Sequence, residues 1–156
     1  MVNFDRTAIQ ATFDEVLEKL AFMFVDVVHP EQIEAVEEPL LKGEMRFKGP
    51  MQGSIAILAP ASLTLELASN ILGLDPEEIH LFPNGVDALG ELLNVVCGHI
   101  LTTIAGEEPV FELSVPETNT IDAGQWADAL KDSNAFAFSV EGTPMILHVS
   151  VTGEPR

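Results

Sequence analysis

The stretch from Pro83 to Gly106 constrains the fold most, because it predicts one long helix with two different faces. At about 100° per residue, a set of mostly apolar residues recurs on one side of this helix. They are Leu89, Leu93, Val96, Ile100 and Thr103. A helix with such a stripe packs it against a sheet or other helices. The rest of the chain must therefore provide a layer that covers it.

The opposite side of the same predicted helix carries a narrow polar line. Asp87, Glu91, Asn94 and Gly98 fall within about 60° of one another on this side. A carboxylate and an amide one turn apart can reach the same target, and Gly98 would let the backbone of a partner come close. The simpler alternative is a solvated helix face, with Asp87 near the positive end of the helix dipole.

A remote proline completes a recognisable spacing. The separations between Asp87, Glu91, Asn94 and Pro116 resemble the signature of the CheC, CheX and FliY family of chemotaxis phosphatases, which has Asp or Ser, Glu, Asn and Pro at these separations. The resemblance implies hydrolysis of the aspartyl phosphate on a phosphorylated CheY-like response regulator. The regulator would bring its own Mg²⁺ and active-site Lys, so no cofactor is expected on this chain.

The resemblance also implies a role for each position of the signature. Asn94 would hold the attacking water by its amide, because an amide can both donate and accept hydrogen bonds. Glu91 would pair with the regulator's Lys and fix the docking. Asp87 and Gly98 would contribute to partner binding, and Pro116 would support the motif.

Two other functions stay open at this stage. Related folds occur in flagellar switch components, so the chain could be a binding module that docks a regulator without turning it over. The amide of Asn94 argues for catalysis, because a pure binding module has no need of it. Asp87 and Glu91 are also close enough for a general acid and base pair, although nothing else suggests a substrate pocket.

The hydrophobic pattern predicts an α+β fold within a single domain, residues 1–156. It has an antiparallel sheet of about six strands with long helices packed on it. Helices are expected at 7–28, ended by His29-Pro30, at 61–72 and at 83–106, with a short one at 126–130. Strands are expected at 33–38, 44–48, 52–58, 110–115, 135–140 and 144–151.

Each half of the chain reads as a long helix followed by about three strands, which predicts a pseudo-twofold repeat. Asp14, Glu18 and Ala21 repeat the spacing of the signature, with Gly43 where the second half has Pro116. CheC-like members resemble a doubled site, and CheX-like members keep one. We therefore expect a CheX-type chain with a degenerate first copy, although coincidental spacing in an acidic helix is a possible explanation.

Charge and residue content exclude several classes of function. The net charge of −18 argues against binding nucleic acid or an anionic membrane. The four histidines and the single Cys97 show no metal-binding spacing, so no metal site is expected. One cysteine cannot form an internal disulfide, and MVNFDRTAIQ is no signal peptide, so a cytoplasmic protein is predicted. The resemblance implies a homodimer paired through sheet edges, and a hydrophobic content of 47% suits a buried interface.

Overall fold

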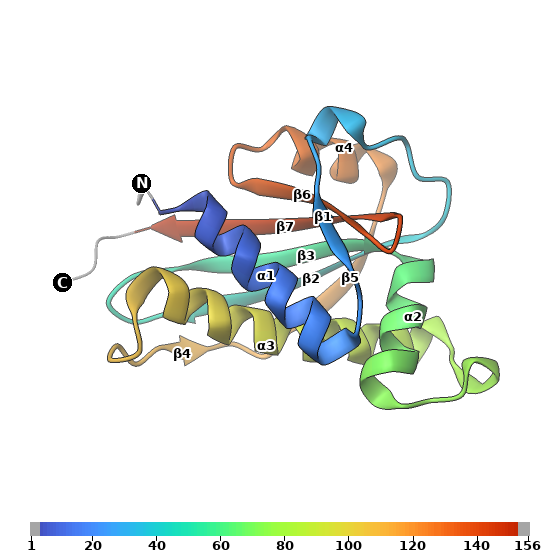
Figure 1. The fold of residues 1–156 in the computed structure, drawn as a ribbon, viewed down its shortest axis with the longest axis horizontal. Helices are drawn as coiled ribbons and strands as arrows, with labels where there is room; N and C mark the ends of the chain where they lie inside the picture. Colours follow the sequence, from blue (N-terminus) through green and yellow to red (C-terminus); the bar gives the residue numbers. More distant parts are fainter. Residues whose placement is uncertain (1–3, 153–156) are drawn as a thin grey trace.

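A computed structural model describes residues 4–152, which form one antiparallel sheet with helices on both faces (Figure 1). The helices are α1 (Arg6–Ala21), α2 (Ala61–Leu72), α3 (Val86–Ala105) and α4 (Ala123–Lys131). The strands are β1 (Val25–Val27), β2 (Leu40–Lys48), β3 (Gln52–Pro60), β4 (Glu112–Leu113), β5 (Glu117–Ile121), β6 (Ala135–Val140) and β7 (Thr143–Thr152). The predicted α+β class is confirmed, with seven strands in the described residues instead of about six.

The order of the strands supports the predicted pseudo-twofold repeat. The sheet reads β1-β6-β7-β3-β2-β4, and β5 also pairs with β2. The order is symmetric about its centre. β1 corresponds to β4, β6 to β2 and β7 to β3, so each strand of one half has a counterpart at the same distance from the centre. Every pair in the sheet is antiparallel, and β3 and β7 meet at its centre. Each half of the chain thus contributes one of the two central strands.

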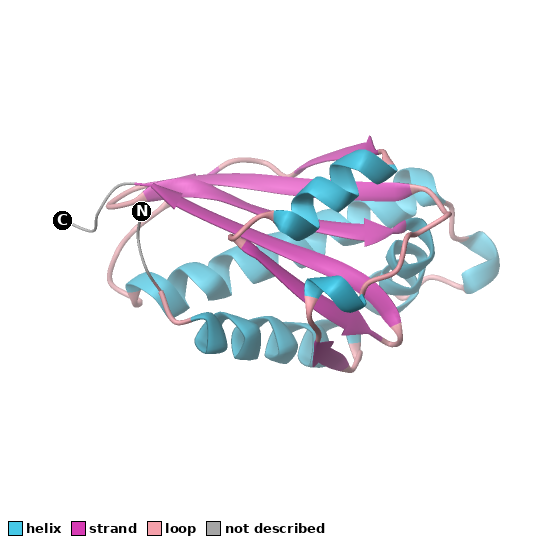
Figure 2. Cartoon of the chain, turned by 90° about the horizontal axis from the view of Figure 1, so that it is seen from above, coloured by secondary structure: helices cyan, strands magenta, loops and turns pink. Residues whose placement is uncertain are grey.

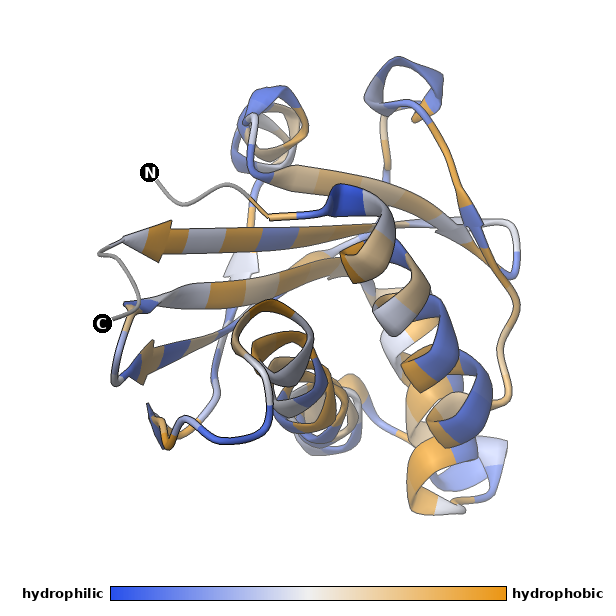
Figure 3. Cartoon of the chain, turned by 60° about the vertical axis from the view of Figure 1, so that its left-hand side comes forward, coloured by the Kyte–Doolittle hydropathy of each residue, from blue (hydrophilic) through white to orange (hydrophobic). Residues whose placement is uncertain are grey.

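The two faces of the sheet bury different helices. Successive side chains of β3 point to opposite faces of the sheet, and both faces of the strand are buried over much of its length. Figure 3 shows the hydrophobic residues along the central strands. Ile55 and Ile57 are fully buried in the large core with α1, α2 and α3. Leu58 faces the other way, into a smaller core around Trp126 of α4. Figure 2 shows these layers, with the sheet between α4 and the long helices.

The first helix ends earlier than the sequence pattern predicts. α1 stops at Ala21, and Phe22 adopts the left-handed conformation with φ 57°. The backbone N–H of Phe22 donates to the carbonyl of Glu18, and that of Met23 donates to the carbonyl of Leu17. The chain then turns into β1, so the expectation of a helix over 7–28 is wrong beyond Ala21. The apolar spacing was misleading because Phe24 is 78% exposed and does not belong to the core.

The predicted strands differ from the structure in several places. Residues 33–38 form no strand, and only Glu112–Leu113 of the expected strand 110–115 pairs with β2. The segment after Pro116 contains β5, which the sequence did not predict because its residues Thr118, Asn119 and Thr120 carry no apolar alternation. β2 begins at Leu40, before the predicted start at Glu44. α2 has the bounds that the pattern predicts.

One helical stretch of the described residues, Leu81–Ala105, is long and apolar enough by composition to cross a membrane. It contains α3, whose apolar stripe is part of the large core. Leu89, Leu93, Val96 and Ile100 are all 0% exposed. This burial in the protein interior accounts for the hydrophobicity of the helix.

Candidate functional site

The polar line of α3 lies at the surface, as the helical spacing predicts. Asp87, Glu91, Asn94 and Gly98 are all exposed, whereas the residues between them are mostly buried. α3 packs against α1, α2 and the sheet, so the helix that carries the line is fixed from several sides. Side chains on such a rigid element are held more precisely than side chains on a loop.

Pro116 comes to this line from a distant part of the chain. It directly precedes β5, which pairs with β2 at the edge of the sheet. A Cβ atom built on Gly90 of α3 would lie 3.7 Å from the Cβ atom of Pro116, which is ordinary van der Waals contact. The proline therefore lies against α3 at Gly90.

A depression of about 380 Å³ opens where Pro116 meets α3. Three of its lining residues, Asp87, Glu91 and Asn94, belong to the predicted polar line. Gly98 does not line it. The full lining consists of Leu72, Val86, Asp87, Gly90, Glu91, Asn94, Pro116 and Thr118. The structure thus joins the four signature residues in one surface feature.

Sequence reasoning missed Gly90, which lies in the depression between the signature residues. The signal was a glycine in the interior of a long helix, where it disfavours helix formation relative to alanine. A conformational reason is excluded, because Gly90 is not among the residues with positive φ. What distinguishes Gly90 is its place in the lining of the depression, where it contributes no side chain.

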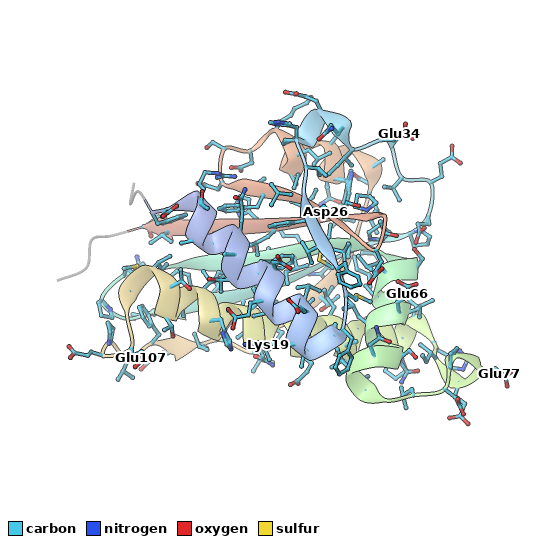
Figure 4. The ribbon with its side chains drawn as sticks, in the orientation of Figure 1. Lys19, Asp26, Glu34, Glu66, Glu77 and Glu107 are labelled. Carbon is cyan, nitrogen blue, oxygen red and sulfur yellow. The ribbon has the colours of Figure 1, made fainter. Side chains whose placement is uncertain are left out.

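The two carboxylates of the site have no cation beside them in the described part of the chain. The ion pairs there join Lys19 with Glu15, Lys42 and Arg46 with Glu44, and His148 with Asp132. Other acidic side chains point outward around the molecule, as Glu34, Glu77 and Glu107 do in Figure 4. Asp87 and Glu91 are therefore available to a cation on a partner.

The predicted first copy of the site does not form an equivalent surface. Asp14 and Glu18 are exposed, but Ala21 is completely buried, and its carbonyl accepts a hydrogen bond from Asn70. The third position of the first copy therefore has neither an amide nor an exposed side chain. That α1 carries a degenerate copy of the site stays a prediction.

Other chemistry has little support in the described residues. Among residues 4–152, no group of three or more His, Cys, Asp and Glu side chains could hold a metal ion. Cys97 is 0% exposed, and burial raises the pKa of its thiol to about 11. Since the thiolate is the reactive form, Cys97 is a packing residue of the core and not a nucleophile.

Comparison with known proteins identifies a family and a shared fold. The family model described as chemotaxis phosphatase CheX matches residues 42–140, a range that includes the whole signature. No curated protein sequence matches the chain at a significant level.

Solved structures share the fold at low sequence identity. A chemotaxis protein CheX from Desulfovibrio desulfuricans is 14% identical with a TM-score of 0.66, covering 94% of this chain and 97% of that one. CheX from Vibrio vulnificus is 20% identical with a TM-score of 0.64, covering 94% and 95%. The CheX-CheY-BeF3-Mg²⁺ complex from Borrelia burgdorferi is 15% identical with a TM-score of 0.60, covering 93% and 96%.

Proposed function

The chain belongs to the CheX family of chemotaxis phosphatases, and from this premise we propose that it hydrolyses the aspartyl phosphate of a CheY-like response regulator in the cytoplasm. The observation that carries the proposal is the exposed pair Glu91 and Asn94, one turn apart on a rigid helix beside Pro116. The solved complex of a CheX with CheY, which has the same fold, supports the choice of partner.

This chain contributes few groups to the proposed mechanism. Phosphoryl transfer passes through a loose, in-line transition state, so catalysis consists mainly of positioning and charge stabilisation. Asn94 accepts a hydrogen bond from the attacking water and orients it toward phosphorus. Mg²⁺ bound by the regulator would supply positive charge to the phosphoryl oxygens. The water oxygen bonds to phosphorus as the bond from phosphorus to the regulator's aspartate breaks, so phosphate leaves with the protons of the water and the aspartate returns as a carboxylate.

Glu91 has a docking role in this mechanism. Its exposed carboxylate has no cation partner in the described residues, so it can form a charge-assisted hydrogen bond with the regulator's active-site Lys. A charge pair between two partners fixes how they dock relative to one another. Asp87, one turn earlier, adds negative charge that favours the same cation.

The two acidic helices give a direct test of this assignment. We expect Glu91→Ala to weaken both regulator binding and turnover, by about tenfold or more, because it removes one partner of a charge pair. Glu18→Ala should leave both nearly intact, since α1 forms no equivalent surface. Steady-state dephosphorylation kinetics of the two variants make the comparison. Equal losses would mean that α1 carries a site of its own.

A binding module without catalysis is the competing function. It is compatible with the fold, which the FliM middle domain from Vibrio alginolyticus also shares with a TM-score of 0.50 and 18% identity. Mixing the protein with a panel of phosphorylated receiver domains and following phosphate release separates the two functions. Phosphate release no faster than each regulator's own rate, together with measurable binding, would establish the binding module.

We also propose a homodimer that pairs through the edge strand β1. Within residues 4–152 this strand pairs only with β6, and three exposed apolar residues lie in or just before it, namely Phe22, Phe24 and Val27. The opposite edge carries exposed apolar residues too, but it borders Pro116 and the depression. Pairing through β1 leaves that site open to the regulator.

The mass in solution tests the dimer. Light scattering at micromolar concentration should give twice the chain mass for the wild type and the monomer mass for Phe24→Asp, because a charge in an apolar interface is costly. Val110→Asp, at the far edge of the sheet, should leave the dimer intact. A monomeric wild type would rule out the dimer, and dissociation only by Val110→Asp would move the interface to the other edge.

A further inference from the structure

The glycine in the depression has a function that the signature residues do not cover. We propose that Gly90 is a specificity-determining residue, because its missing side chain leaves a hollow that receives the side chain of a Lys or Arg from the docked receiver domain. The inference rests on the proposed function in taking a receiver domain as the occupant. It concerns binding, whereas Asn94 concerns the chemical step.

The walls of the hollow suit a long side chain with an apolar stem. Leu72, Val86 and Pro116 contribute apolar side chains to its lining, beside Thr118. Leu72 is 38% exposed, so its apolar surface is accessible. The methylene groups of a Lys or Arg cover apolar surface of this kind while the charged end stays outside it.

The rim of the hollow supplies the complementary charge. Asp87 and Glu91 flank Gly90 along α3, and both are exposed and without a cation in the described residues. A guanidinium or ammonium group that emerges from the hollow meets Asp87, and Glu91 stays available to the regulator's active-site Lys. An aliphatic or acidic side chain would leave Asp87 unpaired, so the hollow selects a cationic one.

Packing within this chain does not require a glycine at position 90. A Cβ atom there would meet only Pro116, at 3.7 Å, whereas one at Gly85 would approach the hydroxyl of Thr64 to 2.8 Å. Gly85 is therefore needed for packing and Gly90 is not. Glycine also weakens a helix, so position 90 carries a residue that neither helix stability nor packing requires. Gly98, where a Cβ atom would meet nothing within 4 Å, lies outside the depression, so the hollow is what distinguishes Gly90.

Filling the hollow in steps separates binding from stability. Gly90→Ala should raise Tm by about 2–4 °C, because alanine is the best helix former and its Cβ fits. It should also raise KM for a phosphorylated receiver domain severalfold. Gly90→Leu fills the hollow, so KM should rise by about tenfold or more while kcat is retained. Differential scanning calorimetry and steady-state dephosphorylation give the two readouts.

Ala127→Leu is the matched control, because it adds the same bulk to an exposed position of α4 on the opposite face of the sheet. It should leave KM and kcat unchanged. The inference is overturned if Gly90→Leu keeps the wild-type KM. It is also overturned if Tm falls in step with the rise in KM, since Gly90 would then serve only contact with Pro116.

The proposed function can fail separately from this inference. If the wild type hydrolyses no phosphorylated receiver, the same variants are tested for binding to receiver domains loaded with beryllofluoride and Mg²⁺. Tight binding by the wild type and tenfold weaker binding by Gly90→Leu would support the inference, although the proposed enzyme activity would be rejected. Equal binding by both proteins, or binding by neither, would overturn it.

Discussion

Replacing Asn94 with alanine should slow dephosphorylation of the regulator by about 10²-fold or more, as removal of one preorganised polar group from a transition state does. The amide holds the attacking water only if it is free, and Asn94 is exposed, with no hydrogen bond of its side chain to another described residue. Single-turnover phosphate release with saturating protein measures the chemical step directly.

Two controls separate catalysis from folding and docking in this variant. Asparagine is a poor helix former and alanine the best, so the free energy of unfolding should rise by some tenths of a kcal/mol. Binding to the regulator should persist, because Glu91 and the depression remain. Unchanged phosphate release by folded Asn94→Ala protein would contradict the mechanism, since a merely solvated amide can be removed at no catalytic cost.

Replacing Phe138 with alanine should lower the free energy of unfolding by about 3–5 kcal/mol, the largest effect that we expect on stability. Phe138 of β6 stacks on Phe13 of α1 with ring centroids 4.5 Å apart, and both side chains are 0% exposed. The substitution leaves a cavity where the first helix meets the sheet. Urea denaturation at fixed protein concentration measures the loss.

An exposed apolar residue outside the proposed dimer interface provides the control for this prediction. Val110 is 84% exposed, so Val110→Ala should change the free energy of unfolding by less than about 0.5 kcal/mol. Similar losses in the two variants would show that the stacked pair contributes no more than surface area in general. A loss below about 1 kcal/mol for Phe138→Ala would mean that the core closes around the gap.

Local signals predicted those elements whose pattern agrees with their packing. α2 is flanked by Pro60 and Gly73, and its predicted bounds are correct. α1 was extended too far because the exposed Phe24 continues an apolar spacing that the core does not use. β5 could not be predicted, since a polar strand at a sheet edge is held by backbone hydrogen bonds to β2 and not by buried side chains.

The candidate site was predictable only along α3 itself. Helical periodicity placed Asp87, Glu91 and Asn94 on one exposed face, which the structure confirms. The depression depends on where β5 brings Pro116, which no local pattern of α3 contains. For the same reason the contact of Pro116 with α3 at Gly90 could not be predicted from the sequence.

The order of strands in the sheet also bears on how fast the chain can fold. β3 ends at Pro60 and its central partner β7 begins only at Thr143, so the middle of the sheet closes by a contact between distant parts of the chain. Such non-local pairing slows folding. Until β7 arrives, β3 has a free apolar edge that includes Ile55 and Ile57, which other chains can join. Refolding should therefore be slow and increasingly prone to aggregation as protein concentration rises, even though the native sheet exposes neither residue.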